Sequence, residues 1–189
     1  MAPLWKVEPA QSFTFTAGHL IPEIYDRFVS HAQTVIRHPR AVAELHRMRI
    51  DGKPLRYLME VFLDRCGVPF SQCYASIKDA IELMGEIHDC DVMIPVLRNY
   101  QQEIRLFNAG MTERKERIST AGILELIRRQ RAQRSRRFEQ LCEVLMAWDA
   151  DHFRDRLLNS IQEIDSAGNL NHREKVSIGN LHPATRTGS

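Results

Sequence analysis

The 189-residue sequence lacks the features of several common protein classes. Its four cysteines are scattered without a C-x-x-C pair, so neither a zinc site nor a redox motif is indicated, and we expect reduced thiols. No apolar run approaches the length of a membrane span, and the N-terminus lacks the basic and apolar segments of a signal peptide. We therefore expect a cytoplasmic protein that has no contact with membranes.

Glycine and proline are sparse between residues 20 and 164, and strand-like alternation is absent there. Apolar residues recur at spacings of three and four, which is the period of an α-helix. The pattern predicts an all-α protein, an antiparallel helical bundle of four long helices plus a short C-terminal helix. We expect these helices at 20–37, 40–65, 71–107, 117–147 and 149–164.

Local chemistry predicts how these helices begin and end. Pro39 ends the first helix, because the residue before a proline is pushed away from helical geometry. Ser71 is the expected N-cap of the third helix, and Gly110 suits a left-handed cap at its end. Gly52 and Pro54 lie inside the second helix, where we expect a kink.

The chain divides into three predicted segments. The helical bundle spans 20–164, and an N-terminal extension over 1–19 precedes it. The final stretch, 165–189, is polar, contains glycine and has no helical period, so we expect a disordered tail.

Net charge is only +2, so an anion site has to come from local clustering of basic residues. Residues 37–56 contain six basic and two acidic residues. Within them, His46, Arg49, Lys53 and Arg56 follow at intervals of three, four and three, which places them on one face of a helix. A solvated basic flank is the ordinary explanation, and a receptor for a polyanion is the other. The apolar stripe predicted beside this row is Leu45, Met48, Leu55, Met59 and Phe62.

Two other helices carry charge on faces that we expect to be core. Residues 113–137 contain nine basic and three acidic residues, and the apolar line of that helix continues through Arg131 and Arg134. In MGEIHDCDV, the apolar face of the third helix leads into His88 and Asp91. Buried unpaired cations are costly, so these faces should meet acids, water or an anionic ligand. The apolar line of the fourth helix is Leu124, Ile127, Phe138, Leu141 and Leu145.

Two stretches together resemble the CHAD family, the conserved-histidine α-helical domain. HRMRIDGKPLRY has a histidine followed by spaced Arg and Lys and then Arg-Tyr, and MGEIHDCDV contains a His-Asp pair after a glycine. The resemblance covers residues 20–160. It implies a helical bundle with a basic central groove that binds inorganic polyphosphate. Such a module is not an enzyme and needs no cofactor or metal.

The resemblance also implies a set of binding residues. The polyphosphate-binding residues carried over from it are His46, Arg49, Lys53, Arg56, Tyr57 and His88. The positions of Arg128, Arg131 and Arg134 in the helical period of the basic stretch 113–137 add these three arginines to the predicted binding residues. Asp89 and Asp91 look like residues that orient the basic side chains.

Family members commonly contain two similar halves, whereas this chain is long enough for one half. A homodimer could therefore rebuild the full groove. Association with polyphosphate granules would be compatible with the expected cytoplasmic location.

Two alternative functions stay open at this point. His88 and Asp89, together with His46, could form the metal site of an HD-type phosphohydrolase, although the surrounding arginines would oppose a divalent cation. The stretch RRQRAQRSRR could instead bind nucleic acid. Aromatic residues make up only 7% of the chain and are not interleaved with this run, so base stacking has little support. We expect nucleic acid only as a competing polyanion.

Overall fold

The computed structural model describes residues 13–161, and every regular element in that range is helical. A helical segment at 153–161 follows the last of the named elements. The predicted all-α fold is confirmed. The elements in chain order are α1 (Phe13–Val29), α2 (Ala32–Arg37), α3 (Val42–Phe62), the short 3-10 helix η1 (Leu63–Arg65), α4 (Val68–Ala109), the short 3-10 helix η2 (Arg114–Glu116) and α5 (Ala121–Ala150).

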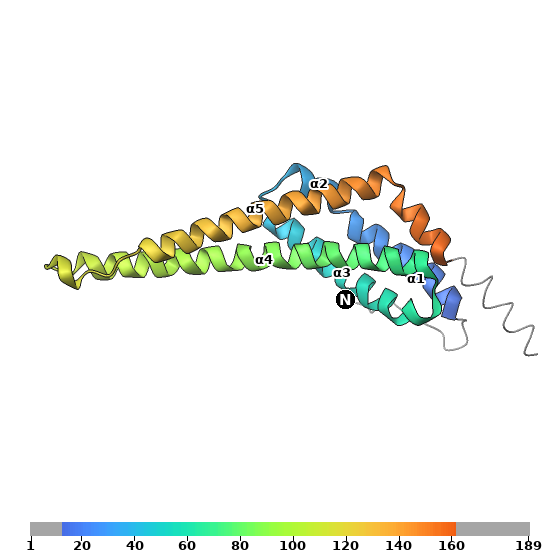
Figure 1. Ribbon diagram of the computed structural model, residues 1–189, viewed down its shortest axis with the longest axis horizontal. Coiled ribbons are helices and arrows are strands. Elements are labelled where there is room, and N and C mark those ends of the chain that lie inside the picture. Colours follow the sequence, from blue (N-terminus) through green and yellow to red (C-terminus); the bar gives the residue numbers. More distant parts are fainter. Residues whose placement is uncertain (1–12, 162–189) are drawn as a thin grey trace, which may run out of the picture.

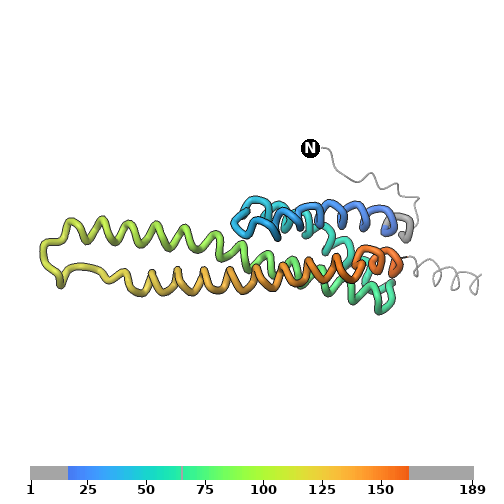
Figure 2. Tube along the Cα trace, turned by 90° about the horizontal axis from the view of Figure 1, so that it is seen from above, coloured from blue at the N-terminus to red at the C-terminus, as the bar shows by residue number. Residues whose placement is uncertain are grey.

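Two long antiparallel helices form the spine of the molecule (Figure 1). α4 has 42 residues and α5 has 30. At 1.5 Å per residue these helices are about 63 Å and about 45 Å long. α1 and α3 lie beside one half of this hairpin, and the other half extends past them (Figures 1 and 2). We call residues 92–133 the arm and the rest of the described chain the bundle.

The hydrophobic core lies in the bundle. Its largest buried side chains include Phe28 of α1, Phe70 of α4 and Phe153 after α5. Beyond Ile94 the only buried residue of α4 is Gln101, and α5, which is also described throughout, buries only Ile127 before Phe138. The arm therefore has a thin seam in place of a core. The predicted stripe of α3 is buried in full, at Leu45, Met48, Leu55, Met59 and Phe62.

α3 is a single helix that includes Gly52 and Pro54. Gly52 is buried where three helices meet. A β-carbon at this position would lie 2.8 Å from Cε2 of Phe28 and 3.1 Å from Cγ1 of Ile81. The absent side chain lets α1 and α4 approach α3 closely. The basic row predicted from the sequence therefore lies on one helix.

The first and last predicted helices have different bounds from those expected. The helix predicted at 20–37 begins at Phe13, and a turn at residues 30–31 divides it into α1 and α2. The bundle thus reaches into the segment predicted as an N-terminal extension. The short C-terminal helix predicted to start at 149 starts at 153, because α5 continues to Ala150.

Two predicted caps are wrong. α4 begins at Val68, so Ser71 is not its N-cap. Pro69 lies in the first turn, where its missing N–H would have had no helical partner in any case. Gly110 follows α4 with φ of −83°, which is right-handed, so it is not a left-handed cap. The next helix starts at Ala121, four residues later than predicted, after η2.

The tail predicted at 165–189 and the first twelve residues of the predicted extension lie outside the described residues. Within residues 13–161, no helix is both long enough and apolar enough to span a membrane.

Candidate functional site

α3 and α4 line an open cavity of about 470 Å³ on the surface of the bundle. Arg49, Lys53, Arg56 and Tyr57 come from α3, where their spacing places them along one side of the helix. The structure thus brings together four of the residues predicted from the sequence. The opposite wall comes from α4 and consists of Ile81, Glu82, Gly85, Glu86 and Asp89.

Gly85 gives Arg49 its place in this cavity. A β-carbon on Gly85 would lie 3.7 Å from Nε of Arg49 and 4.0 Å from its Nη2, so the guanidinium packs directly over the backbone of α4. A side chain longer than alanine at this position would displace it. The glycine of the MGEIHDCDV stretch therefore has a structural role next to the basic row.

Within residues 13–161, no ion pair joins Arg49, Lys53 or Arg56 to a carboxylate. Nε of Arg49 is buried and has no hydrogen-bond partner. A buried N–H without an acceptor costs free energy, so an oxygen atom placed against Arg49 would gain a hydrogen bond.

Tyr57 holds Arg56 at the edge of the cavity. The guanidinium carbon of Arg56 lies 4.5 Å from the centre of the Tyr57 ring, within the range of a cation–π contact. A side-chain hydrogen bond with Tyr57 raises the pKa of Arg56 above its ordinary value. These contacts orient the cation without neutralising its charge.

The carboxylates of the α4 wall differ in their partners. Glu82 is paired with Lys78 at 3.8 Å, and Glu86 is paired with Arg137 of α5. Asp89 is exposed and forms no ion pair among the described residues. It stands at the end of the wall that is nearest the arm.

The two predicted histidines lie beside the cavity and are not part of its lining. His46 of α3 stacks on His88 of α4, with ring centres 4.9 Å apart and an angle of 28° between the planes. Nδ1 of His46 is buried without a hydrogen-bond partner. The stacked rings join α3 to α4 one turn before Arg49, which fixes the spacing of the two helices where the cavity begins.

The three arginines predicted on α5 lie outside the cavity. Arg134 donates from Nε to Oδ1 of Asp91 at 2.5 Å and from Nη2 to the carbonyl oxygen of Pro39 at 3.0 Å. Arg128 donates to Glu125 on the same helix, and Arg131 is exposed on the arm. The prediction that Asp91 orients a basic side chain is confirmed, whereas Asp89 pairs with no basic side chain among residues 13–161. The role of the three arginines in binding stays a prediction.

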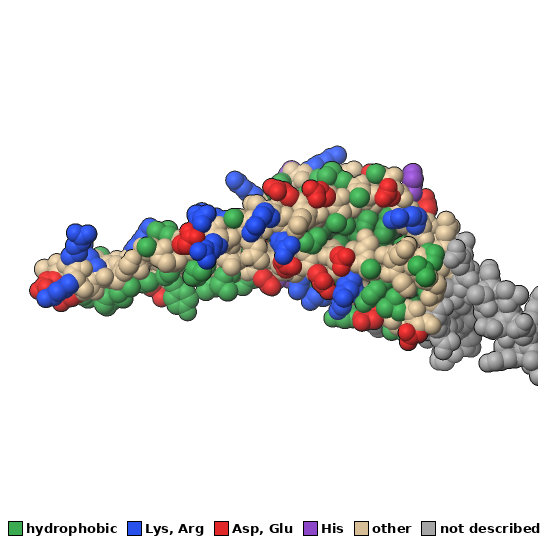
Figure 3. Space-filling view, in the orientation of Figure 1, with side chains coloured by type: hydrophobic (Ala, Val, Ile, Leu, Met, Phe, Trp, Pro, Cys, Tyr) green, Lys and Arg blue, Asp and Glu red, His purple; other side chains and the backbone are tan. Residues whose placement is uncertain are grey.

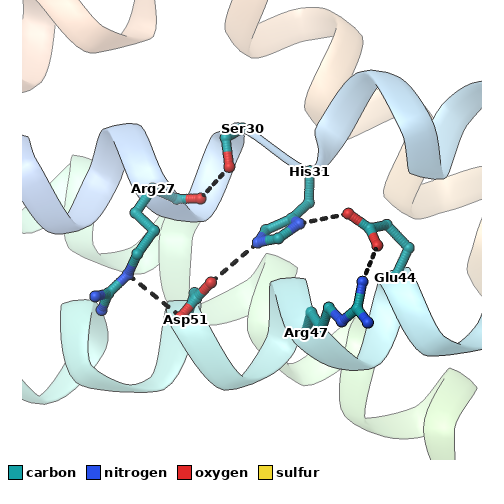
Figure 4. Close-up of polar contacts among 6 residues, drawn as sticks. All are labelled: Arg27, Ser30, His31, Glu44, Arg47 and Asp51. Carbon is teal, nitrogen blue, oxygen red and sulfur yellow. Dashed lines mark hydrogen bonds and ion pairs between the residues drawn. The ribbon is translucent and has the colours of Figure 1, made fainter. Parts of the chain in front are cut away.

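A second polar cluster, which the sequence analysis missed, faces α1 and α2 from another side of α3 (Figure 4). His31, in the turn between α1 and α2, has Nδ1 2.7 Å from Oε1 of Glu44 and Nε2 2.9 Å from Oδ2 of Asp51. Arg27 and Arg47 approach the same two carboxylates, at 3.3 Å from Asp51 and 3.1 Å from Glu44. The acidic residues of the 37–56 stretch are thus engaged away from the cavity.

This cluster changes the protonation of His31. Partial burial of the ring by itself lowers the pKa, but hydrogen bonds and charges from Glu44 and Asp51 outweigh it and raise the pKa of His31. The hydrogen bond from His31 in turn lowers the pKa of Glu44. A protonated His31 donates to both carboxylates and ties the α1–α2 turn to α3. The sequence analysis missed this contact because residue 31 lies inside the helix predicted at 20–37.

Across residues 13–161, no three His, Cys, Asp or Glu side chains are grouped so that they could hold a metal ion. The arrangement that the described residues do offer is a set of fixed hydrogen-bond donors and positive charges on one wall of an open cavity.

Comparison with known proteins places the chain in a family. The family model for the CHAD domain matches residues 4–98, a range that includes α1, α2, α3 and all cavity residues of α4. α5 and its arginines lie beyond this match, although the resemblance seen in the sequence was expected to reach residue 160. No curated protein and no solved structure matched the chain. Because the match covers half of its length, the chain belongs to the CHAD domain family.

Proposed function

We propose that the protein binds inorganic polyphosphate, without catalysis, in the cavity between α3 and α4. The observation that carries this proposal is that Arg49, Lys53 and Arg56 share one open cavity and form no ion pair with any carboxylate of residues 13–161. CHAD domains are associated with polyphosphate binding as a family, which supports the choice of this anion.

The electrostatics of the row support an anionic ligand. Two cations about 6 Å apart repel each other by roughly 0.7 to 3 kcal/mol for effective dielectric constants between 80 and 20. Among residues 13–161 no ion pair with these cations offsets the repulsion, and two of the three carboxylates on the opposite wall, Glu82 and Glu86, are paired with other cations. A bound polyanion removes it, forms charge-assisted hydrogen bonds with the guanidinium and ammonium groups, and releases counterions.

The shape of the row favours a linear anion over a compact one. Arg49 and Arg56 are seven residues apart on one side of α3, so their α-carbons are separated by about 10 Å along the helix axis. Lys53 lies between them and faces the same cavity. Orthophosphate can contact only part of this row, whereas a chain of phosphoryl groups can contact all three cations at once.

Titration of the purified protein with anions of increasing length tests the proposal. We expect orthophosphate to bind weakly and affinity to rise steeply from pyrophosphate to long chains. The logarithm of affinity should fall with the logarithm of salt concentration by about 0.7 per phosphate contact, by analogy with single-stranded nucleic acid. Equal affinity for orthophosphate and long-chain polyphosphate would contradict the proposal.

Two controls separate this function from the alternatives. Single-stranded DNA and RNA of matched charge should bind more weakly than polyphosphate and should be displaced by it. No phosphate should be released when the protein is incubated with polyphosphate and divalent cations, because the arginines around the cavity oppose a catalytic metal. Metal-dependent release that is lost in both His88→Ala and Asp89→Ala would favour a phosphohydrolase instead.

A further inference from the structure

The arm exposes a stripe of large apolar side chains on α4. Six of them are between 41% and 67% exposed, although none lies in a loop. The space-filling view shows hydrophobic side chains along the lower edge of the arm, away from the lysine and arginine side chains of its upper edge (Figure 3). The six residues are Val92, Met93, Val96, Tyr100, Leu106 and Phe107.

The spacing of this stripe is that of a helix–helix contact. Met93, Val96 and Tyr100 follow at three and four residues, and Phe107 comes seven residues later. Val92 and Leu106 stand next to this line on its flank. A repeat of alternating threes and fours is the seam by which one helix packs along another. The seam towards α5 is a different one, because it contains the buried residues Ile94 and Gln101.

The exposed area is large enough for a specific contact between proteins. Half-exposed aliphatic and aromatic side chains, with full areas of roughly 150 to 250 Å² each for the aromatic ones, add up to about 500 Å² for the six residues. An area of this size is comparable to the largest apolar patch of a typical monomer, and such a patch often has a function. If two such stripes cover each other, about 1,000 Å² is buried, which is the lower bound for a specific interface.

We propose that this stripe is covered by the arm of a second copy of the chain, packed antiparallel about a two-fold axis near Tyr100. A second copy presents a stripe of the same length and spacing, so the contact is self-complementary. In this arrangement Met93 of one copy lies opposite Phe107 of the other, and the two Tyr100 side chains meet at the axis. The pair of hairpins forms a four-helix contact along the arms.

Charge selects the antiparallel direction. The tip of the arm carries three basic residues, Arg114, Lys115 and Arg117, against the two acidic residues Glu113 and Glu116, and Lys115 is paired with Glu113 at 2.7 Å. A parallel dimer would bring the remaining net positive charge of the two tips together. Antiparallel packing separates the two tips. Ala109, the last residue of α4, lies about 13 Å from Tyr100 along the axis, so the tip of one copy reaches the level of Asp89 in the other. Asp89 is the cavity carboxylate without an ion pair, and it can accept a partner's cation there.

Sedimentation of the full chain over a dilution series in the micromolar range tests the dimer. We expect wild type to sediment as a dimer and the double variant Val96→Glu/Tyr100→Glu to sediment as a monomer with an unchanged helical circular dichroism spectrum. Val61→Glu is the control, because Val61 is also an exposed apolar residue, at 65%, but lies on α3 in the bundle. A monomeric wild type, or a dimer that survives the double substitution, would overturn the proposal.

Site-specific cross-linking tests the antiparallel direction. A short bismaleimide should join Met93→Cys to Phe107→Cys when the two variants are mixed, and it should join neither variant to itself. Self-linking of Phe107→Cys would indicate a parallel dimer and overturn the proposed geometry. The native thiols give a low background, because burial raises the pKa of Cys66 to about 11 and also raises that of Cys142.

The dimer and polyphosphate binding can fail separately. The substituted positions 96 and 100 are not in the cavity lining. A monomeric Val96→Glu/Tyr100→Glu variant that still binds polyphosphate would confirm the interface and leave the cavity's function intact. A dimeric protein without affinity for polyphosphate would support the interface and contradict the function proposed for the cavity.

Discussion

The two basic stretches of the chain differ in what surrounds their cations. The run on α5 is the denser of the two in sequence, yet four of its arginines each contact a carboxylate: Arg128, Arg129, Arg134 and Arg137. The row on α3 contributes three cations that share a cavity and form no ion pair among residues 13–161: Arg49, Lys53 and Arg56. A dense basic run can therefore be partly neutralised by its own fold, here by the three carboxylates of Glu86, Asp91 and Glu125. Cations without an ion pair indicate a candidate anion site better than a large number of cations does.

The largest expected effect comes from removing the α3 row. The triple variant Arg49→Gln/Lys53→Gln/Arg56→Gln should lose polyphosphate affinity by about a thousandfold, because each charge-assisted hydrogen bond contributes at least about 1.5 kcal/mol. Its melting temperature without ligand should equal or slightly exceed that of wild type, since the repulsion within the row is relieved. Isothermal titration and thermal melts measure both.

The matched control makes the same change of charge on α5. Arg128→Gln/Arg129→Gln/Arg131→Gln also removes three cations, but from the exposed arm outside the cavity. We expect a much smaller loss of affinity, confined to long chains that extend past the cavity. Equal losses in the two triple variants would mean that affinity follows net charge and not the cavity.

The next largest effect concerns the stability of the fold and involves a paired arginine of α5. Asp91→Ala leaves Arg134 without its carboxylate in a site where the two side chains are only 9% and 17% exposed. Stranding a buried cation in this way should lower the free energy of unfolding by about 3 kcal/mol. Urea denaturation measures the change. Asp89→Ala, two residues away and without an ion pair, should shift it by no more than about 0.5 kcal/mol.

A pair of glycine substitutions tests how α3 is held against its neighbours. Gly52→Ala places a β-carbon 2.8 Å from Phe28, so the strain should exceed the gain in helix propensity and cost about 1 to 2 kcal/mol of stability. Gly85→Ala places it 3.7 Å from Arg49, an ordinary contact, and should be neutral or stabilising. Chemical denaturation of both variants decides this. A stabilising Gly52→Ala would contradict the close helix crossing.

The smallest effect is the pH dependence contributed by His31. Because its folded pKa is raised above the ordinary value of 6.5, its contribution to stability is complete below about 6.5 and is lost as pH rises through the folded pKa. The stability difference between wild type and His31→Gln should therefore shrink from pH 6 to pH 9. Denaturation at several pH values measures it. A difference that grows with pH would show that His31 is neutral in the fold.

Features set by local spacing were predicted well from the sequence. The row predicted from spacing, His46, Arg49, Lys53 and Arg56, needs only a continuous helix to lie on one side. The cavity contains three of these four residues, and His46 lies beside it. The buried stripe of the same helix was predicted for the same reason. Confirmation of these features follows from the 3.6-residue period alone.

Features set by contacts between distant segments were not predicted. The hydrogen bonds of His31 depend on the turn between α1 and α2, which brings residue 31 beside Glu44 and Asp51. No local sequence pattern predicts this contact. The arm was also missed, because its apolar residues repeat like those of a core. Leu124, predicted as core, is 47% exposed on the arm. Periodicity identifies a face that packs against something, but it does not say whether the partner belongs to the same chain.

α4 continues from the bundle into the arm as one helix, and Pro95 lies near the start of the arm. Proline has no N–H to donate to the carbonyl oxygen of Asp91, so α4 lacks one backbone hydrogen bond there and a kink is favoured at this point. The segment from Pro95 to Ala109 is about 21 Å long, and a bend of about 20°, the size at which helix kinks begin, would swing its end by about 7 Å. A bend of α4 at Pro95 would therefore move the far end of α4 most. The ion pair between Asp91 and Arg134 joins α4 to α5 one turn before Pro95 and would oppose such a bend, so the contact that neutralises a cation would also steady the arm.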